Sequence, residues 1–179
     1  TDEEELLSEV NALRTSVDHI KAVVAAQQAY ATGMSGFIEQ VSLEDMLEDA
    51  LQINAASMTR HAVEIVRQFN AIEPILSDRQ KLLQIVVNLI NNAVDAMMGQ
   101  DDRLVRIVVN DGERLTVTVR DIGPGLKQPE KVFEPFFSHR PDDNGGGMGL
   151  AMVHSFMAQT GGAVRLLSEE GFGTTFKLY

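Results

Sequence analysis

The most informative stretch of this sequence reads Gln84-Ile-Val-Val-Asn88-Leu-Ile-Asn91-Asn92-Ala-Val-Asp95-Ala96. On a helix, its polar side chains fall within an arc of about 100°, and apolar side chains fill most of the remaining circumference. Carboxamides buried without hydrogen-bond partners would cost free energy. The polar stripe therefore either faces solvent or lines a polar pocket, and this stretch alone leaves both alternatives open. The stripe consists of Gln84, Asn88, Asn91, Asn92 and Asp95.

The overall composition is that of an ordinary globular protein. The chain has 179 residues, of which 44% are hydrophobic and 23% are charged, which allows one good-sized domain or one domain with an appendage. A net charge of −11 without a basic stripe argues against nucleic-acid binding. The lack of cysteine excludes disulfides and Cys-ligated zinc, and it suits a cytoplasmic protein.

The sequence contains no apolar run long enough to span a bilayer and no signal-peptide pattern. We therefore expect this portion to be cytoplasmic and to carry no membrane segment. Because the first residue is Thr1 rather than Met, we expect a fragment of a longer protein, whose membrane anchor could lie outside it.

The N-terminal part, residues 5–31, has the heptad pattern of a coiled coil. Its seam positions are spaced alternately four and three residues apart for nearly four heptads. This period favours a long helix that packs on another helix, in a homodimer or a helical bundle, over one that packs on its own domain. Glycines in residues 32–36 mark the boundary between a domain of residues 1–36 and one of residues 37–179. The seam consists of Leu6, Val10, Leu13, Val17, Ile20, Val24, Gln27 and Ala31.

Beyond this boundary, helices and strands are predicted in an irregular order. Capping boxes at Ser42–Asp45 and Ser77–Gln80 begin two helices, and Asn110-Asp-Gly112 is typical of a hairpin turn. The order indicates an α+β fold, a two-layer sandwich of a mixed, largely antiparallel sheet with helices on one face. Strands are expected at residues 37–41, 62–69, 104–109, 115–119, 163–168 and 174–179, and helices at 43–58, 78–98 and 148–160.

Three downstream stretches could contact a phosphate-bearing ligand, although each alone is weak evidence. Asp121-Ile-Gly-Pro-Gly125 ends a strand, where a carboxylate can accept from an exocyclic amine and glycines admit a flat ligand; the alternative is a common turn. Gly145-Gly-Gly-Met-Gly149 opens a helix and would present free N–H groups to phosphate; the alternative is a flexible loop end. Gly171-Phe-Gly-Thr174 places a hydroxyl before the last strand.

Two amides of the central stretch suit a magnesium ion. Asn88 and Asn92 are i, i+4 neighbours on one helix face. Their oxygens are hard ligands that Mg²⁺ accepts alongside nucleotide phosphate and water. Two neutral ligands suffice if the nucleotide brings the negative charge, which favours a lined pocket over a solvated face.

Five motifs, in order, resemble the N, G1, F, G2 and G3 boxes of sensor histidine kinases. The resemblance covers about residues 38–179. It implies the Bergerat-type nucleotide fold shared with DNA gyrase, MutL and heat-shock chaperones, and ATP–Mg²⁺ binding under a mobile lid of residues 126–147. The motifs are Gln84-x-x-x-Asn88-x-x-x-Asn92-Ala93, Asp121-Ile-Gly-Pro-Gly125, Phe133-Glu-Pro-Phe-Phe137, Gly145-Gly-Gly-Met-Gly-Leu-Ala151 and Gly171-x-Gly-Thr174.

The resemblance also implies roles for individual residues. Asn88 and Asn92 would ligand Mg²⁺, and Asp121 would bond the adenine amine, with Thr174 assisting through water. The glycine-rich box would lie under the phosphates, and Phe133 with Phe136 and Phe137 would anchor the lid. The remaining ATP-binding residues implied are Gly123, Gly125, Gly145, Gly147, Met148, Gly149 and Leu150.

One departure from the family concerns the cation that contacts phosphate. The family often has a Lys three residues after the second box Asn, but this chain has Asp95 there. Arg140 is the candidate replacement, and the alternative for Arg140 is a solvated charge on the lid. Asp95 itself is kept as a candidate ATP contact.

The histidine that accepts phosphate is not identified by the sequence. Residues 5–31 resemble the second helix of the dimerisation and phosphotransfer hairpin, whose acceptor box lies on an earlier helix outside this chain. His19 is exposed on the heptad, but the Glu and Pro of an acceptor box do not follow it, so a surface histidine is the default expectation. His154 is expected to pack.

Three functions remain under consideration. The first is the catalytic part of a histidine kinase, dimeric through residues 5–31, with an upstream sensor domain and a response-regulator receiver domain as partner. The second is an ATP-hydrolysing relative of gyrase or MutL, disfavoured because those enzymes carry a Glu general base where Asn88 stands. The third is a non-catalytic dimeric regulator that retains the nucleotide fold.

Overall fold

The structure is a computed structural model that describes residues 37–70, 72–135, 137 and 147–179. The predicted coiled-coil helix of residues 5–31, with His19, lies outside the described residues. Within the described ranges, no helix combines the length and the apolar character needed to cross a bilayer.

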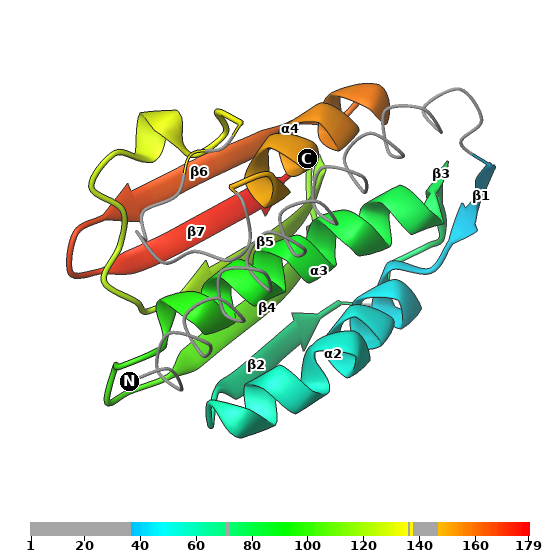
Figure 1. Ribbon diagram of the computed structural model, residues 1–179. Coiled ribbons are helices and arrows are strands. Elements are labelled where there is room, and N and C mark those ends of the chain that lie inside the picture. The colour runs from blue at the N-terminus through cyan, green and yellow to red at the C-terminus, as the bar shows by residue number, and fades with distance from the viewer. Residues whose placement is uncertain (1–36, 71, 136, 138–146) are drawn as a thin grey trace, which may run out of the picture.

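A five-stranded sheet forms one layer of the domain (Figure 1). Its strand order is β2-β4-β5-β7-β6, and β2 pairs with β4 in parallel while every other pair is antiparallel. The predicted mixed, largely antiparallel sheet is therefore confirmed. The strands are β2 (Glu64–Phe69), β4 (Leu104–Asp111), β5 (Leu115–Asp121), β6 (Val164–Glu169) and β7 (Gly173–Leu178).

Three helices form the second layer, and all lie on the same face of the sheet (Figure 1). They are α2 (Leu43–Arg60), α3 (Arg79–Ala96) and α4 (Gly149–Gln159). α3 lies between the other two and packs against both. The predicted two-layer α+β sandwich is confirmed.

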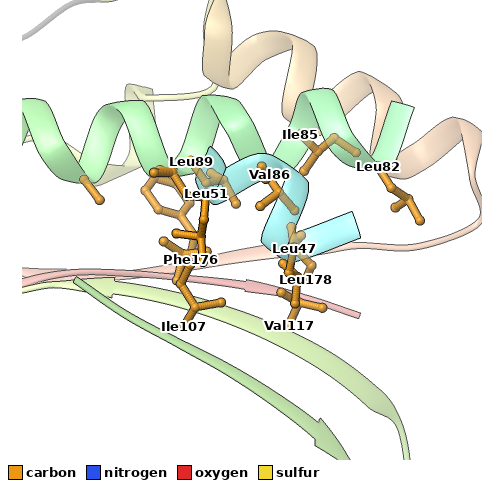
Figure 2. Packing of buried hydrophobic residues seen from close by; sticks show 14 of the residues in the cluster. Leu47, Leu51, Leu82, Ile85, Val86, Leu89, Ile107, Val117, Phe176 and Leu178 are labelled. Atoms are coloured by element: carbon orange, nitrogen blue, oxygen red, sulfur yellow. The ribbon is translucent and has the colours of Figure 1, made fainter. Parts of the chain in front are cut away.

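The core lies between the helices and the inner face of the sheet. On β4, Val105, Ile107 and Val109 are buried while Arg106 between them is exposed, which is the alternation expected for a strand covered on one face. Figure 2 shows Leu47 and Leu51 of α2 and Val86 and Leu89 of α3 pointing toward Ile107, Val117, Phe176 and Leu178 of the sheet. This packing fixes which side of α3 is apolar, and so where its polar stripe can face.

A two-stranded antiparallel sheet precedes α3 and was only half expected. β1 (Ile38–Val41) matches the predicted strand, but its partner β3 (Ile75–Asp78) was not predicted. Four residues after Pro74 are too few to show a strand period, so no local signal marks β3.

α3 begins one residue later than the capping box at Ser77–Gln80 predicts, so the predicted N-cap residue, Ser77, is wrong. Ser77 pairs with Glu39 in the β1–β3 ladder, which keeps its backbone extended. Asp78 is the N-cap instead, and its Oδ1 accepts a hydrogen bond of 3.1 Å from the Lys81 N–H. The other predicted cap is confirmed, because Ser42 Oγ accepts from the Asp45 N–H at 3.3 Å.

Candidate functional site

The polar stripe of α3 divides between solvent and interior. Asn88 and Asn92 are half-buried, whereas Gln84, Asn91 and Asp95 are exposed. The solvent-facing alternative thus holds for part of the stripe, and the pocket-lining alternative stays a prediction for Asn88 and Asn92. The half-buried pair is the pair that the i, i+4 spacing singled out.

The beginning of α4 lies beside Asn88. A Cβ atom placed on Gly149, the first residue of α4, would lie 3.8 Å from both the Cγ and the Oδ1 atoms of Asn88. The N-cap position, Met148, supplies no side-chain hydrogen bond to the first turn. The free N–H groups of this helix end and the Asn88 amide therefore lie together.

The Asn88 amide has an unmet hydrogen-bonding need. Its Nδ2 atom is buried and makes no hydrogen bond to any described residue. A buried donor without a partner costs on the order of 1–3 kcal/mol. An amide presents a donor nitrogen and an acceptor oxygen, so this side chain can bind a phosphate oxygen, a cation or both. The orphaned donor fits a site that a ligand completes.

A cation at this place would need help from the ligand itself. Across the described part of the chain, no three His, Asp or Glu side chains are grouped so as to hold a metal. The oxygens of Asn88 and Asn92 are neutral. The donor set therefore fits a Mg²⁺ ion that arrives with an anionic ligand, and it does not fit a bare ion.

Asp121, the last residue of β5, forms the other end of the site. It is 3% exposed, and its Oδ1 accepts from the Gly123 N–H at 2.9 Å and the Thr174 N–H at 3.1 Å. Burial raises the pKa of this carboxyl group, and the two backbone N–H groups and Arg120 offset part of the rise. Because Oδ1 accepts both bonds, Oδ2 can accept from an amine on a ligand.

The glycines after Asp121 are required first by the packing of the chain itself. Gly125 has a φ of +72°, and a Cβ atom on it would lie 2.1 Å from the carbonyl oxygen of Glu169. A Cβ atom on Gly123 would lie 3.0 Å from the carbonyl oxygen of Ala96, at the end of α3. These contacts explain both glycines without a ligand. Their predicted role of admitting a flat ligand stays a prediction.

A hydroxyl pair connects Thr174 to the neighbouring strand. Thr174 Oγ1 and Ser168 Oγ lie 3.0 Å apart, and Ser168 Oγ also accepts from the Leu126 N–H at 2.9 Å. Sequence reasoning missed Ser168, because a serine near the end of a strand has no distinctive local pattern.

Phe133 fastens the segment after β5 to the rest of the domain. Its ring centroid lies 5.6 Å from that of His154 on α4, and 6.3 Å from that of Phe176 on β7 in an edge-on arrangement. His154 contacts this ring although its side chain is exposed. The packing of Phe133 suits an anchor.

Other candidates are placed less fully. Gly147, Met148 and Leu150 are half-buried around the start of α4. Arg140, Gly145 and Phe136 lie outside the described residues, as does most of the predicted lid.

The two ends of the site lie along one helix. From Asn88 to Ala96, α3 rises about 12 Å, at about 1.5 Å per residue. Asn88 and Gly149 mark one end, and Gly123 with Asp121 lies at the other. The arrangement suits an elongated ligand that is anionic at one end and carries an amine at the other.

Comparison with known proteins identifies relatives of this arrangement. Residues 77–179 match the family described as histidine kinase-, DNA gyrase B- and HSP90-like ATPase. The sensor histidine kinase ZraS of Salmonella typhi is 33% identical over 147 residues, which cover 79% of this chain and 31% of the relative. The histidine-protein kinase AtoS of Escherichia coli K12 is 27% identical over 165 residues, 90% of this chain and 27% of that protein. The chain thus spans about a third or less of the length of these relatives.

Solved structures agree in fold. Full-length ShkA in complex with AMPPNP superposes with a TM-score of 0.77 and 28% identity, covering 97% of this chain and 38% of that one. The catalytic domain of the histidine kinase ThkA, in a nucleotide-free form, gives a TM-score of 0.69 at 20% identity, covering 79% of this chain and 93% of that one.

Proposed function

The chain belongs to the family of histidine kinase-, DNA gyrase B- and HSP90-like ATPases, and we propose that it is the ATP-binding catalytic portion of a sensor histidine kinase. Of the relatives named above, ZraS is a sensor histidine kinase and AtoS a signal transduction histidine-protein kinase. The observation that carries the proposal is the orphaned, buried Asn88 amide beside the uncapped start of α4. A triphosphate with its cation would provide partners for the Asn88 amide and for the free N–H groups at the start of α4.

The residues of the chain would bind and orient the nucleotide from its two ends. The oxygens of Asn88 and Asn92 would hold Mg²⁺, and the N–H groups at the start of α4 would bind phosphate. Asp121 Oδ2 would accept from the adenine amine, with Thr174 assisting through water. Asp95, Arg140 and Gly145 stay sequence-based candidates. When bound, ATP supplies the phosphoryl group and Mg²⁺ neutralises charge on its oxygens.

The residue at position 88 favours phosphotransfer over hydrolysis. Gyrase-like enzymes, which this family includes, resemble this fold but carry a Glu general base where Asn88 stands. An amide cannot take a proton from water, so the chain offers no base for hydrolysis at this position. In phosphoryl transfer, the residues of the chain would position the nucleotide and neutralise charge with the bound cation.

The acceptor and the partners follow from the same proposal. The acceptor would be a histidine on a dimerisation hairpin, with residues 5–31 as its second helix and His19 as a minor candidate. The phosphoryl group would pass to the receiver domain of a response regulator. A homodimer through residues 5–31 and an upstream sensor domain complete the proposed assembly.

Two measurements on the 179-residue chain test the proposal. Calorimetric titration with ATP, with and without Mg²⁺, should show affinity that depends on the cation. ATP labelled on its γ-phosphate should then label a histidine on an upstream hairpin helix supplied in trans. Absence of ATP affinity would leave a non-catalytic regulator as the better account. Steady ATP hydrolysis without a histidine substrate would favour the gyrase-like alternative.

A further inference from the structure

Ser168, near the end of β6, joins three parts of the chain through one hydroxyl group. Its Oγ accepts from the Leu126 N–H at 2.9 Å, lies 3.0 Å from Thr174 Oγ1, and lies 3.1 Å from the Gly173 carbonyl oxygen. Leu126 directly follows the loop that Asp121 begins, and Thr174 donates its N–H to Asp121. Ser168 therefore contacts two segments that flank Asp121: the end of its loop at Leu126, and β7 at Thr174.

The proton count shows what this hydroxyl controls. A serine hydroxyl has one hydrogen and two lone pairs, and the Leu126 N–H occupies one lone pair. If the Ser168 hydrogen goes to the Gly173 carbonyl, Thr174 donates to Ser168 and presents its lone pairs elsewhere. If it goes to Thr174 instead, the Thr174 hydrogen is released for another acceptor. In both arrangements Ser168 decides whether Thr174 offers a ligand a donor or an acceptor.

Backbone contacts hold the same junction. The Gly171 N–H donates to the Pro124 carbonyl at 2.8 Å, and the close approach of Gly125 to Glu169 leaves no room for a Cβ atom. The turn between β6 and β7 is thus held against the loop of residues 121–125. Ser168 adds to this junction a side chain that reaches a proposed ligand contact.

We propose that Ser168 is a positioning residue for nucleotide binding, which orients the Thr174 hydroxyl toward the base and fixes the loop of residues 121–125 from its far end at Leu126. This inference rests on the proposed function, because it assumes that the base binds at Asp121. Ser168 acts through Thr174 and Leu126 and does not itself touch the nucleotide.

A purely structural role for Ser168 makes a different prediction. A hydroxyl that only joined β6 to β7 would affect the free energy of unfolding and leave ATP affinity in the folded protein unchanged.

The test is a double-mutant cycle on ATP affinity, measured calorimetrically with Mg²⁺ on the 179-residue chain. Ser168→Ala and Thr174→Ala should each weaken binding by about threefold to tenfold, the scale of one hydrogen bond. The double variant should lose less affinity than the two single losses added together, because part of the Ser168 effect passes through Thr174. Ser168→Thr, which keeps a hydroxyl, should restore most of the affinity.

Thr116→Ala is the matched control, because it removes a different hydroxyl, which bonds the Asn110 carbonyl within the β4–β5 hairpin. It should bind ATP as the wild type does. If Ser168→Ala does not fold, Ser168→Cys serves instead, since a thiol keeps the shape but bonds weakly, and the same loss is expected.

The outcomes separate this inference from the proposed function. A wild-type chain without ATP affinity would overturn both. Wild-type affinity with an unaffected Ser168→Ala or Ser168→Cys variant, or with additive losses in the double variant, would overturn the role of Ser168 alone.

Discussion

The backbone N–H of Thr174 donates to Asp121 Oδ1 at 3.1 Å, a contact between residues 53 positions apart in the sequence. It joins the second residue of β7 to the last residue of β5, and these two strands are neighbours in the sheet. The bond fixes one carboxylate oxygen and leaves the other for a ligand. The fold thus holds the Asp121 carboxylate in one orientation, which suits the proposed recognition of an amine.

The exchange Asp121→Asn tests recognition of the base. The new amide keeps an oxygen for the Gly123 and Thr174 N–H groups but replaces the ligand-facing acceptor with a donor. The new amide NH₂ group then faces the adenine amine, which is also a donor, so ATP affinity should fall by about tenfold to a hundredfold. Calorimetric titration measures this, and Asp111→Asn, on an exposed residue of the same hairpin, is the control. Unchanged affinity would remove Asp121 from the base site.

The raised pKa of Asp121 predicts a pH dependence of stability. An acid whose pKa is higher in the folded than in the unfolded state binds more protons when folded, so its contribution to stability falls as the pH rises between the two values. Above the raised pKa, Asp121→Asn should therefore be more stable relative to the wild type than it is at acidic pH. Urea unfolding of both proteins across this range measures the difference. A constant difference would contradict the burial effect.

Asn88→Ala should separate stability from function. Removing the orphaned Nδ2 relieves a buried, unpaired donor, so the ligand-free variant should lose little stability or gain about 1 kcal/mol. Stabilisation by ATP and Mg²⁺ should disappear, because the proposed metal ligand is gone. Asn92→Ala should also lose the ligand effect.

Asn91→Ala is the matched control for both changes, since Asn91 is the exposed amide on the same turn of α3. Thermal unfolding with and without ATP–Mg²⁺ provides the measurement. If Asn88→Ala and Asn92→Ala were stabilised by the ligand as fully as Asn91→Ala, the metal assignment would be wrong.

Gly125→Ala tests the close approach between the loop after β5 and the end of β6. The added Cβ atom would lie 2.1 Å from a carbonyl oxygen, at a φ of +72°, so the free energy of unfolding should fall by about 3 kcal/mol or more. Gly112→Ala, where nothing lies within 4 Å of the new atom, should change it by less than about 1 kcal/mol. Equal effects in urea unfolding would show that the loop can move away from Glu169.

The fold was predictable where the sequence has local signals. The Asn110-Asp-Gly112 turn predicted the hairpin of β4 and β5, the apolar side chains around most of the central stretch predicted α3, and the irregular order of helices and strands predicted the two layers. β3 was missed because its partner, β1, lies more than thirty residues earlier and the pair is made by backbone bonds that no local pattern records. The same pairing displaced the helix cap from Ser77 to Asp78.

The candidate site could be proposed from residue types, but the packing constraint on its glycines could not. Asn88 was singled out as an amide in an otherwise largely apolar helix, and Asp121 as a carboxylate that ends a strand and precedes two glycines. Gly125 was predicted to admit a flat ligand, and that role stays a prediction; the structure adds that Glu169 leaves no room for a Cβ atom on this residue. Ser168 could not be found at all, since its importance depends on Leu126 and Thr174, which only the folded chain brings to it.

The two-stranded sheet connects the first described residues of the chain to the start of α3. Ile38, one residue after the start of the described chain, pairs with Asp78, which caps α3. The other end of α3 lies against Gly123, beside Asp121. The β1–β3 ladder therefore joins Phe37, where the described chain begins, to the first turn of the helix that carries Asn88 and Asn92.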